Sequence, residues 1–271
     1  MRPRIIPDEP RPLLFAHRGV SSEAPENTMA AFRLARDKGL GGVELDVHLT
    51  ADGRLAVIHD HFTGRTAGAE GLEPGPGAKG RGLELERASW PELKRLDVGA
   101  WKGRGYSGEG IPLLEELFEE LGEALYFDIE LKNGARSDYG LEAAVAKAIR
   151  GARGGRGLFG RCVVCSFNPV SLARFKSLMP EVPTGMLWSG DAELPAYLRH
   201  GEGRFIGRTD FLKPAKEKVK AASAFHWRRL GGYEVLPWTV DEPEAAKRLL
   251  ALGCVGLVSN RPHELGVEVR R

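Results

Sequence analysis

Two carboxylates lie two residues apart in an apolar stretch of the sequence, Val43-Glu44-Leu45-Asp46-Val47. In a β-strand, side chains two residues apart point to the same face, so Glu44 and Asp46 are expected side by side. Like charges at this spacing raise each other's pKa unless a cation lies between them, and hard divalent cations prefer oxygen ligands. The pair indicates a metal site. The alternative is a solvated strand end, where each acid pairs with a neighbouring cation.

A second apolar stretch repeats this arrangement, because Asp128, Glu130 and Lys132 alternate with Ile129 and Leu131. Glu130 is placed to be a third oxygen ligand. Lys132 beside it offers a compact positive charge for a phosphate oxygen. The simpler alternative is an ordinary Glu/Lys ion pair.

His17 and His59 each follow a short apolar run, which is the place where the strands of an α/β barrel deliver catalytic side chains to a common rim. Cleavage of a phosphodiester needs one group to remove a proton from the nucleophile and another to protonate the leaving alkoxide. The pKa of histidine suits both tasks. The two histidines are therefore predicted to form an acid/base pair, and the sequence leaves open which is the acid.

Other residues near these runs could contact a substrate. Arg18 offers a bidentate fork to phosphate oxygens. Phe167 and Trp238 end further apolar runs and could form a wall for the alcohol part of a substrate, although core packing explains them almost as well. Asp60 could orient an imidazole or cap a turn, and His48 is expected at the rim and not as a ligand.

Short apolar runs that read as strands alternate with amphipathic stretches that read as helices, which predicts an α/β fold. There are nine strand candidates where a barrel closes on eight, so one of them is peripheral, and residues 204–206 are the weakest. The predicted strands are 13–16, 42–49, 55–59, 124–131, 162–166, 184–188, 204–206, 234–240 and 255–258. The predicted helices are 29–38, 113–121, 139–149, 170–178, 215–230 and 243–252, and Asn27 or Thr28 suits the cap of the first.

Residues 61–110 interrupt this alternation with Gly- and Pro-rich stretches around a short helix near 90–96. We expect an insertion that covers one barrel mouth. The domain prediction is a single barrel domain over residues 1–271, with the insertion at about 61–110.

The formal charge of +2, from 39 basic and 37 acidic residues, gives no argument for nucleic-acid binding. No apolar run approaches the roughly 18 residues of a membrane span, and the first residues show no apolar signal core, so a cytoplasmic protein without stable membrane association is predicted. The three cysteines, Cys162, Cys165 and Cys254, are too few for a disulfide framework and are expected to be core thiols.

Several motifs occur in an order that resembles the glycerophosphodiester phosphodiesterases. No single motif is specific, but the ordered set runs from about residue 13 to residue 262. The motifs are His17-Arg18-Gly19, Glu26-Asn27-Thr28, Glu44-Leu45-Asp46-Val47 with Thr50 and Asp52-Gly53, His59-Asp60, Ile111-Pro112, Glu130-Leu131-Lys132, Ser166-Phe167 and Trp238-Thr239-Val240.

The resemblance implies a (β/α)8 barrel of the triosephosphate-isomerase type, with a small insertion after the third strand. It implies Mg²⁺ or Ca²⁺ on Glu44, Asp46 and Glu130. His17 and His59 would be the acid and base, with Arg18 and Lys132 on the phosphate. The implied reaction is hydrolysis of a small glycerophosphodiester to glycerol 3-phosphate and an alcohol. In a similar family mechanism the glycerol hydroxyl attacks first, and water opens the resulting cyclic phosphate.

Two positions depart from the family pattern. Leu212-Lys213-Pro214 stands where a His-Pro pair is frequent, and Ser259-Asn260 stands where Thr-Asp is frequent. Neither position belongs to the implied metal or acid/base set, so these departures are expected to affect substrate detail more than activity. Two other functions stay open: a related phosphodiesterase or lyase acting on lysophospholipid or inositol lipid head groups, and a barrel that binds a phosphoester without cleaving it. The sequence does not indicate an oligomeric state.

Overall fold

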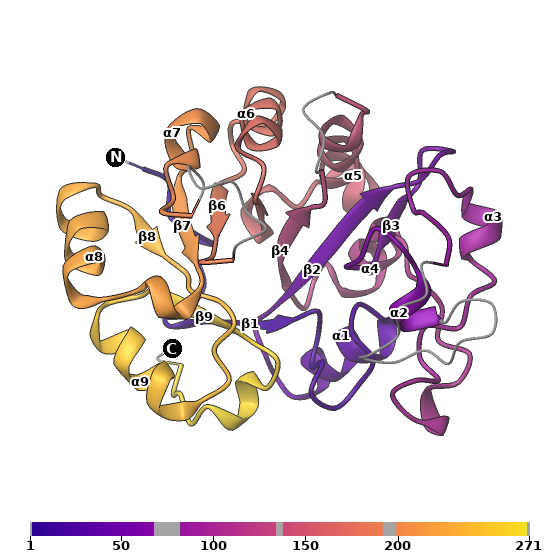
Figure 1. Cartoon of the computed structure of the whole chain (residues 1–271), viewed down its shortest axis with the longest axis horizontal. Coiled ribbons are helices and arrows are strands. Elements are labelled where there is room, and N and C mark those ends of the chain that lie inside the picture. The colour runs from indigo at the N-terminus through magenta and orange to yellow at the C-terminus, as the bar shows by residue number, and fades with distance from the viewer. Residues whose placement is uncertain (1, 68–81, 134–137, 192–198, 270–271) are drawn as a thin grey trace.

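Eight parallel strands form a nearly closed barrel in the computed structural model, which describes residues 2–67, 82–133, 138–191 and 199–269 (Figure 1). The strand order is β8-β7-β6-β5-β4-β2-β1-β9. Backbone hydrogen bonds from Val258 N to Pro237 O (3.0 Å) and from Val240 N to Val258 O (2.8 Å) join the two ends of this order. The predicted (β/α)8 barrel is confirmed. Its strands are β1 (Leu13–His17), β2 (Gly42–Leu49), β4 (Tyr126–Leu131), β5 (Cys162–Ser166), β6 (Thr184–Trp188), β7 (Phe211–Pro214), β8 (Glu234–Val235) and β9 (Gly256–Ser259).

Helices surround the barrel, and hydrophobic packing between helices and strands fixes the direction of each strand side chain. Leu45 and Val47 of β2 belong to a buried cluster with Phe118 from the surrounding helices. Because side chains alternate along a strand, Glu44 and Asp46 face the opposite way, into the barrel. The long helices are α1 (Met29–Asp37), α4 (Leu114–Leu121), α5 (Leu141–Gly155), α6 (Pro169–Leu178) and α9 (Pro243–Ala251), and the short ones are α7 (Gly203–Gly207) and α8 (Ala221–Phe225), followed by a π-helical turn (His226–Leu230).

Several of the predicted elements agree with the structure in detail. Thr28 caps α1 as expected, since its hydroxyl accepts a hydrogen bond from Ala31 N at 3.3 Å. All three cysteines are buried as free thiols, as expected. No helix in the described part of the chain is long and apolar enough to cross a membrane.

One strand prediction is wrong and one strand was missed. The run at 204–206 lies in α7, where Phe205 is 67% exposed and therefore contributes no core packing. The strand at this point of the barrel is β7, a segment of only four residues that includes a buried lysine. A buried lysine interrupts the apolar pattern by which a strand is recognised.

The third strand of the chain, β3 (Leu55–Val57), is not part of the barrel wall. It pairs antiparallel to the outer half of β2, with Val47 opposite Val57, and so forms a hairpin beyond the rim. The chain returns along β2 until Ile58 N donates to Asp46 O at 3.0 Å. His59 therefore reaches the rim on a strand that runs opposite to the one we expected, but it arrives at the predicted place.

The insertion that follows β3 has a small hydrophobic cluster of its own, which includes Ile58, Leu85 and Leu93. Its helices are α2 (Gly64–Ala67), α3 (Trp90–Leu93) and a 3₁₀ turn (Arg104–Tyr106). Lys102 Nζ donates to Ser21 O at 2.7 Å, and Tyr106 Oη donates to Glu23 O at 3.0 Å. These contacts fasten the insertion to the loop that follows β1. The extent of the single domain stays a prediction.

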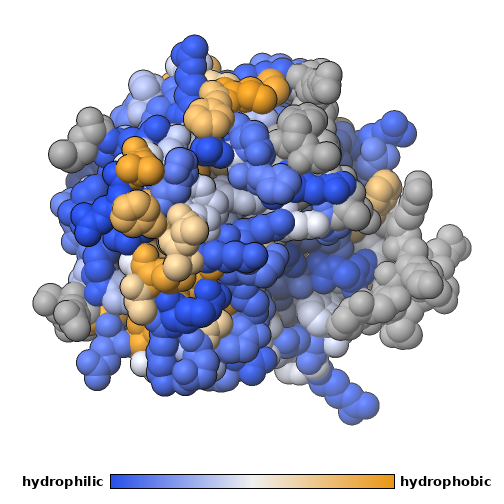
Figure 2. All heavy atoms as spheres, turned by 60° about the vertical axis from the view of Figure 1, so that its left-hand side comes forward, coloured by the Kyte–Doolittle hydropathy of each residue, from blue (hydrophilic) through white to orange (hydrophobic). Residues whose placement is uncertain are grey.

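Apolar side chains are exposed on the side of the molecule that carries α7 and α8 (Figure 2). Phe205, Ile206, Phe225 and Leu230 are 52–70% exposed there. Hydrophilic side chains surround the apolar ones in the same view. An exposed apolar surface of this kind bears on whether the substrate is a lipid.

Candidate active site

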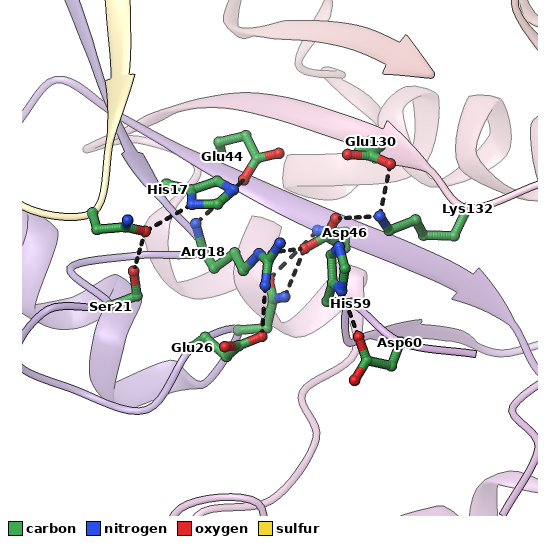
Figure 3. Close-up of polar contacts among 12 residues, drawn as sticks. His17, Arg18, Ser21, Glu26, Glu44, Asp46, His59, Asp60, Glu130 and Lys132 are labelled. Atoms are coloured by element: carbon green, nitrogen blue, oxygen red, sulfur yellow. Dashed lines mark hydrogen bonds and ion pairs between the residues drawn. The ribbon is translucent and has the colours of Figure 1, made fainter. Parts of the chain in front are cut away.

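A cavity of about 450 Å³ opens where the parallel strands end, and it contains most of the predicted site residues. Asp46 and Lys132 contact the residues of its wall (Figure 3). All nine side chains predicted from the sequence therefore lie in or beside one cavity. It is lined by His17, Arg18, Glu44, His59, Glu130, Phe167, Leu187, Ser189, Asp191, Lys213 and Trp238.

The three carboxylates form a tight buried group. Oxygen atoms of Glu44, Asp46 and Glu130 lie within 4.8 Å of one another, and the residues are 2%, 1% and 7% exposed. The register between β2 and β4 explains this closeness, because Asp46 is directly opposite Glu130. Two parallel neighbouring strands thus bring together acids that are 84 residues apart in the sequence.

Burial and mutual repulsion make full ionisation of this group costly. Burial raises the pKa of Glu44 to about 8, Lys213 opposes that rise, and Asp46 adds to it. Burial would also raise the pKa of Asp46, but Lys132, His59 and Arg18 hold it well below its ordinary value. The site therefore keeps Asp46 ionised and leaves Glu44 in need of further positive charge.

The wider network of charges fits a divalent cation. Apart from the histidines, its ion pairs join six carboxylates to only four cationic side chains, an excess of two negative charges when all are ionised. Asp46 Oδ1 is buried and accepts no hydrogen bond from the described residues, although Lys132 Nζ lies 3.1 Å away. A hard cation with oxygen ligands satisfies both features. The network comprises Glu26, Glu44, Asp46, Asp60, Asp128 and Glu130 with Arg18, Arg65, Lys132 and Lys213.

His17 is held by a neutral amide. Its Nδ1 lies 2.7 Å from Asn260 Oδ1, an oxygen that can only accept, so Nδ1 carries the proton. Its Nε2 then has the lone pair and lies 3.7 Å from Glu44 Oε2. Burial, together with the charge of Arg18, lowers the pKa of His17 to about 3, so this imidazole is neutral.

His59 is held by a carboxylate instead. Its Nδ1 lies 2.6 Å from Asp60 Oδ1. Asp60 also contacts Arg65, whose guanidinium donates to both oxygens of Glu26 at 2.6 and 2.9 Å. Of the two roles open to Asp60, the contact therefore favours orientation of the imidazole.

Arg18 and Lys132 each contact the carboxylates. Arg18 donates to Glu26 Oε1 at 2.9 Å, and its Nε lies 3.3 Å from Asp46 Oδ2. Lys132 Nζ lies 2.7 Å from Glu130 Oε1. Both side chains are mostly buried yet reach the cavity region, so they can add positive charge to a bound phosphate.

Phe167 and Trp238 form an apolar part of the cavity wall. Their ring centroids are 5.6 Å apart with an interplanar angle of 85°, an edge-to-face contact. Trp238 Nε1 donates to Lys213 O at 3.0 Å, which fixes the indole. The two rings pack on each other and also face the cavity, and their contact with a substrate stays a prediction.

Both departures from the family pattern contact the site, which their spacing in the sequence does not indicate. Asn260 binds His17, and Asp241 fixes Asn260 by accepting from its Nδ2 at 2.7 Å. Lys213 is 1% exposed, and its Nζ lies 2.8 Å from Asp128 Oδ2 and 3.5 Å from Glu44 Oε1. Neither residue is a member of the implied acid/base or metal-ligand set, but both contact it, and the expectation that these departures affect substrate detail more than activity stays a prediction.

Asn27 is a further residue whose role the sequence did not reveal. It is 2% exposed and donates to Asp46 Oδ2 at 2.8 Å. The sequence placed it beside the helix cap, which pointed to a local role, and in the Glu26-Asn27-Thr28 motif, which did not indicate its partner. A buried amide that binds a carboxylate across the fold has no signature in sequence spacing.

Comparison with known sequences identifies a family. A sequence model of the glycerophosphoryl diester phosphodiesterase family matches residues 17–264. A glycerophosphodiester phosphodiesterase of Caldanaerobacter subterraneus is 33% identical over 260 residues, which cover 96% of this chain and 98% of the relative. One from Bacillus altitudinis is 34% identical, covering 95% and 97% of the two chains.

Solved structures show the same similarity. A phosphodiesterase of Oleispira antarctica, in complex with the product sn-glycerol-3-phosphate, has a TM-score of 0.76 and 28% identity, over 94% of this chain and 95% of the other. A protein of Silicibacter pomeroyi described as a putative glycerophosphoryl diester phosphodiesterase has a TM-score of 0.77 and 27% identity, over 93% and 91%. The similarity extends over nearly the whole of both chains.

Proposed function

The chain belongs to the glycerophosphoryl diester phosphodiesterase family and is a phosphodiester hydrolase, and we propose how its own residues release glycerol 3-phosphate and an alcohol from a glycerophosphodiester. The observation that carries the proposal is the meeting of two differently held histidines with three buried carboxylates in one cavity. Catalysis needs an acid, a base and charge neutralisation in the same place, and these residue types supply all three.

Glu44, Asp46 and Glu130 would hold the divalent cation, Mg²⁺ or Ca²⁺, which fits their oxygen chemistry and the two excess negative charges. When bound, this cation neutralises charge on the phosphate and makes the phosphorus easier to attack. The choice between the two metals depends on how freely the carboxylates adjust, because Mg²⁺ demands a nearly ideal octahedron and Ca²⁺ does not.

His17 is assigned as the base and His59 as the acid. The base must present a lone pair, and the amide of Asn260 keeps the proton of His17 on Nδ1 so that Nε2 is free to accept. The acid must hold a proton on the nitrogen that faces the substrate, and this role is given to His59, whose Nδ1 is held by the carboxylate of Asp60.

In the proposed reaction, one proton moves to His17 and one leaves His59 as the phosphodiester bond is exchanged. The attacking hydroxyl gives its proton to His17 Nε2 as its oxygen bonds to phosphorus. The bond from phosphorus to the alcohol oxygen breaks, and His59 protonates that oxygen. Arg18 and Lys132 add positive charge where the phosphate oxygens gain negative charge. If the substrate's glycerol hydroxyl is the attacking group, the product is a cyclic phosphate, which water opens in a second round with the two histidines in reversed roles.

The Oleispira antarctica phosphodiesterase has sn-glycerol-3-phosphate as its product, which supports the same product for this chain. The cavity also suits a small substrate, since about 450 Å³ is close to the lower end of ordinary ligand pockets, roughly 300–1,000 Å³. Phe167 and Trp238 would pack against the apolar part of the glycerol or of the alcohol.

A lysophospholipid or inositol lipid remains the second candidate, because the exposed apolar side chains near α7 and α8 could contact lipid (Figure 2). The test is a substrate panel followed by phosphorus NMR: glycerophosphocholine, glycerophosphoethanolamine, glycerophosphoinositol and a lysophospholipid. Glycerol 3-phosphate from the water-soluble diesters is the expected product. Turnover of the lysophospholipid alone would contradict the proposal and favour the lipid-directed activity. A cyclic phosphate signal that rises and then falls would identify the glycerol hydroxyl as the first nucleophile.

A further inference from the structure

A second group of possible metal ligands lies outside the carboxylate site, where the insertion meets β2. It consists of His48, His61 and Glu86, which each offer one ligand atom within 4.8 Å of the others. His48 Nδ1 lies 2.9 Å from Glu86 Oε1, and His61 Nδ1 lies 2.8 Å from the same oxygen. Two imidazole nitrogens from different segments thus converge on one carboxylate.

His48 makes polar contacts through both of its ring nitrogens. Its Nε2 lies 3.2 Å from the carbonyl oxygen of His59, which can only accept, so Nε2 carries a proton. Its Nδ1 faces the carboxylate oxygen Glu86 Oε1 at 2.9 Å. Either a proton or a metal cation can lie between these two atoms, and His61 Nδ1 lies close to the same oxygen.

The hydrogen bond of His48 to the backbone is also the arrangement that prepares a histidine to bind metal. A metal-bound imidazole donates its other N–H to a carbonyl or carboxylate, which fixes the ring and the tautomer. His48 is 0% exposed and sits on a rigid strand, so its ring has one orientation.

The other two ligands are fixed by backbone pairing within the insertion. Leu85 N donates to His61 O at 3.0 Å, and an antiparallel bridge joins Phe62 to Glu84. This pairing sets His61 and Glu86 on the same side as His48. The side chain of His61 is 51% exposed, so one side of the group is open to solvent and can accept a water molecule as a further ligand.

We propose that His48, His61 and Glu86 form a binding site for a divalent transition-metal cation of the zinc type, separate from the carboxylate site. Two imidazoles and one carboxylate are a ligand set that Zn²⁺ favours and that Mg²⁺ and Ca²⁺ do not. The site joins β2 to the insertion, and through His48 it also contacts the backbone of His59. Its role is to fasten the insertion at the rim, and it does not depend on the proposed reaction.

The test measures zinc binding with the carboxylate site already filled. Full-length protein is freed of metal, saturated with millimolar Mg²⁺ and titrated with Zn²⁺ against a chromophoric chelator, with bound metal counted by mass spectrometry. One tight equivalent of zinc is expected. His61→Ala and Glu86→Gln should each weaken its binding by at least about tenfold, the scale on which even outer-shell changes weaken metal sites.

The controls are matched by residue type and exposure. His226→Ala removes an exposed histidine and Glu84→Gln a carboxylate next to the site that faces Arg87, and both should keep the tight equivalent. Glu44→Gln should keep it too, which separates this site from the carboxylate site. Co²⁺ in the same titration should give the visible absorption of a nitrogen-ligated ion, and Glu86→Gln should change that spectrum.

The absence of a tight zinc equivalent in the wild-type protein would overturn the proposal, because a proton would then lie between His48 and Glu86. Equal zinc affinity in wild type, His61→Ala and Glu86→Gln would overturn it as well. Glu86→Gln keeps the size of the side chain, so it decides the matter if His61→Ala does not fold.

Discussion

His17 and His59 differ in the residue that contacts the Nδ1 atom of each ring. The side chain of Asn260 is neutral, and its Oδ1 accepts a hydrogen bond from Nδ1 of His17. Asp60 is charged and lies 2.6 Å from Nδ1 of His59. The proposed mechanism gives these two chemically identical side chains opposite roles on the basis of these single contacts.

The first prediction separates these roles with a better leaving group. His17→Ala and His59→Ala should each lower kcat for glycerophosphocholine by about 10²- to 10⁴-fold, the usual contribution of one acid or base. In a p-nitrophenyl phosphodiester of glycerol, the p-nitrophenolate leaving group needs no protonation. This substrate should therefore restore most of the activity of His59→Ala and none of that of His17→Ala.

Metal affinity, measured by calorimetry, should stay near that of wild type in both variants, since neither histidine is assigned as a ligand. If the same substrate restored the activity of His17→Ala instead, the acid and base roles of the two histidines would be reversed. Loss of metal binding in either variant would make that histidine a ligand.

Lys213 carries the second residue-scale prediction. Its ammonium is fully buried against Asp128 and Glu44, so Lys213→Met leaves both carboxylates without it. Breaking a buried pair by removing one partner costs about 3–5 kcal/mol, whereas replacing both partners by apolar residues costs much less. The free energy of unfolding by urea should fall by that amount in Lys213→Met and recover in part when Asp128→Leu is added.

Lys247→Met is the control, because the Lys247 side chain is exposed and pairs only with the exposed Glu244 in the described structure. It should leave the unfolding midpoint unchanged. A double variant as unstable as Lys213→Met alone would contradict this account of Lys213.

Some of the site residues could be predicted from the sequence and others could not. Glu44, Asp46 and Glu130 were predictable because period-two spacing in apolar strands is unusual for acids. Lys213 and Asn260 were not, because their partners lie far away in the sequence: Lys213 is 169 residues from Glu44, and Asn260 is 243 residues from His17. Only the fold brings such pairs together.

At the scale of elements, the turn after β1 places His17 and Arg18. Arg18 and Gly19 both have positive φ, 56° and 79°, which directs the chain sharply into the loop before α1. A Cβ on Gly19 would lie 2.6 Å from Ala31, so the turn packs directly on α1. Only glycine fits both the backbone angle and the space.

Gly19→Ala and Gly53→Ala make a matched pair of tests. Gly53 has φ of 80° but nothing within 4 Å of an added Cβ. Gly53→Ala should cost only the strain of the left-handed backbone, about 1–2 kcal/mol. Gly19→Ala should cost about 1–3 kcal/mol more through overpacking, and it should also lower kcat because His17 and Arg18 move.

Thermal unfolding and turnover measured together check this pair. Equal loss of stability in the two variants would show that the loop adjusts around Ala31 and that the turn is not as constrained as the distance implies.

Elements were predictable where they are long and amphipathic. α1, α4 and α9 lie within one residue of the predicted ranges, because their buried faces repeat with the helical period. β7 and β8, with four and two residues, are too short to show a period. The antiparallel direction of β3 could not be predicted from the sequence either, because the direction of a strand depends on the strand with which it pairs.

At the scale of the whole molecule, the buried carboxylates of the site oppose folding in their ionised form until a cation binds, because burial and their mutual repulsion disfavour that form. A ligand that binds only the folded chain stabilises it by about 2.7 kcal/mol at 100 times its Kd. The melting temperature should therefore rise with the concentration of Mg²⁺ or Ca²⁺ and fall in chelator.

Glu44→Gln and Glu130→Gln should weaken this dependence on metal, because each removes a charged ligand. Glu123→Gln should not, since the Glu123 side chain is 79% exposed and pairs with Arg153 outside the site. If the melting temperature of the wild-type protein did not change with added metal, the assignment of the carboxylates as metal ligands would be contradicted.

The most direct measurement is release of glycerol 3-phosphate from glycerophosphocholine by metal-free protein, before and after Mg²⁺, Ca²⁺ or Mn²⁺ is restored, in wild type and in Glu44→Gln. The account predicts no release without metal, recovery with at least one of these ions, and little recovery in Glu44→Gln at the same metal concentration. Full release by the metal-free wild-type protein, or equal recovery in the variant, would contradict it.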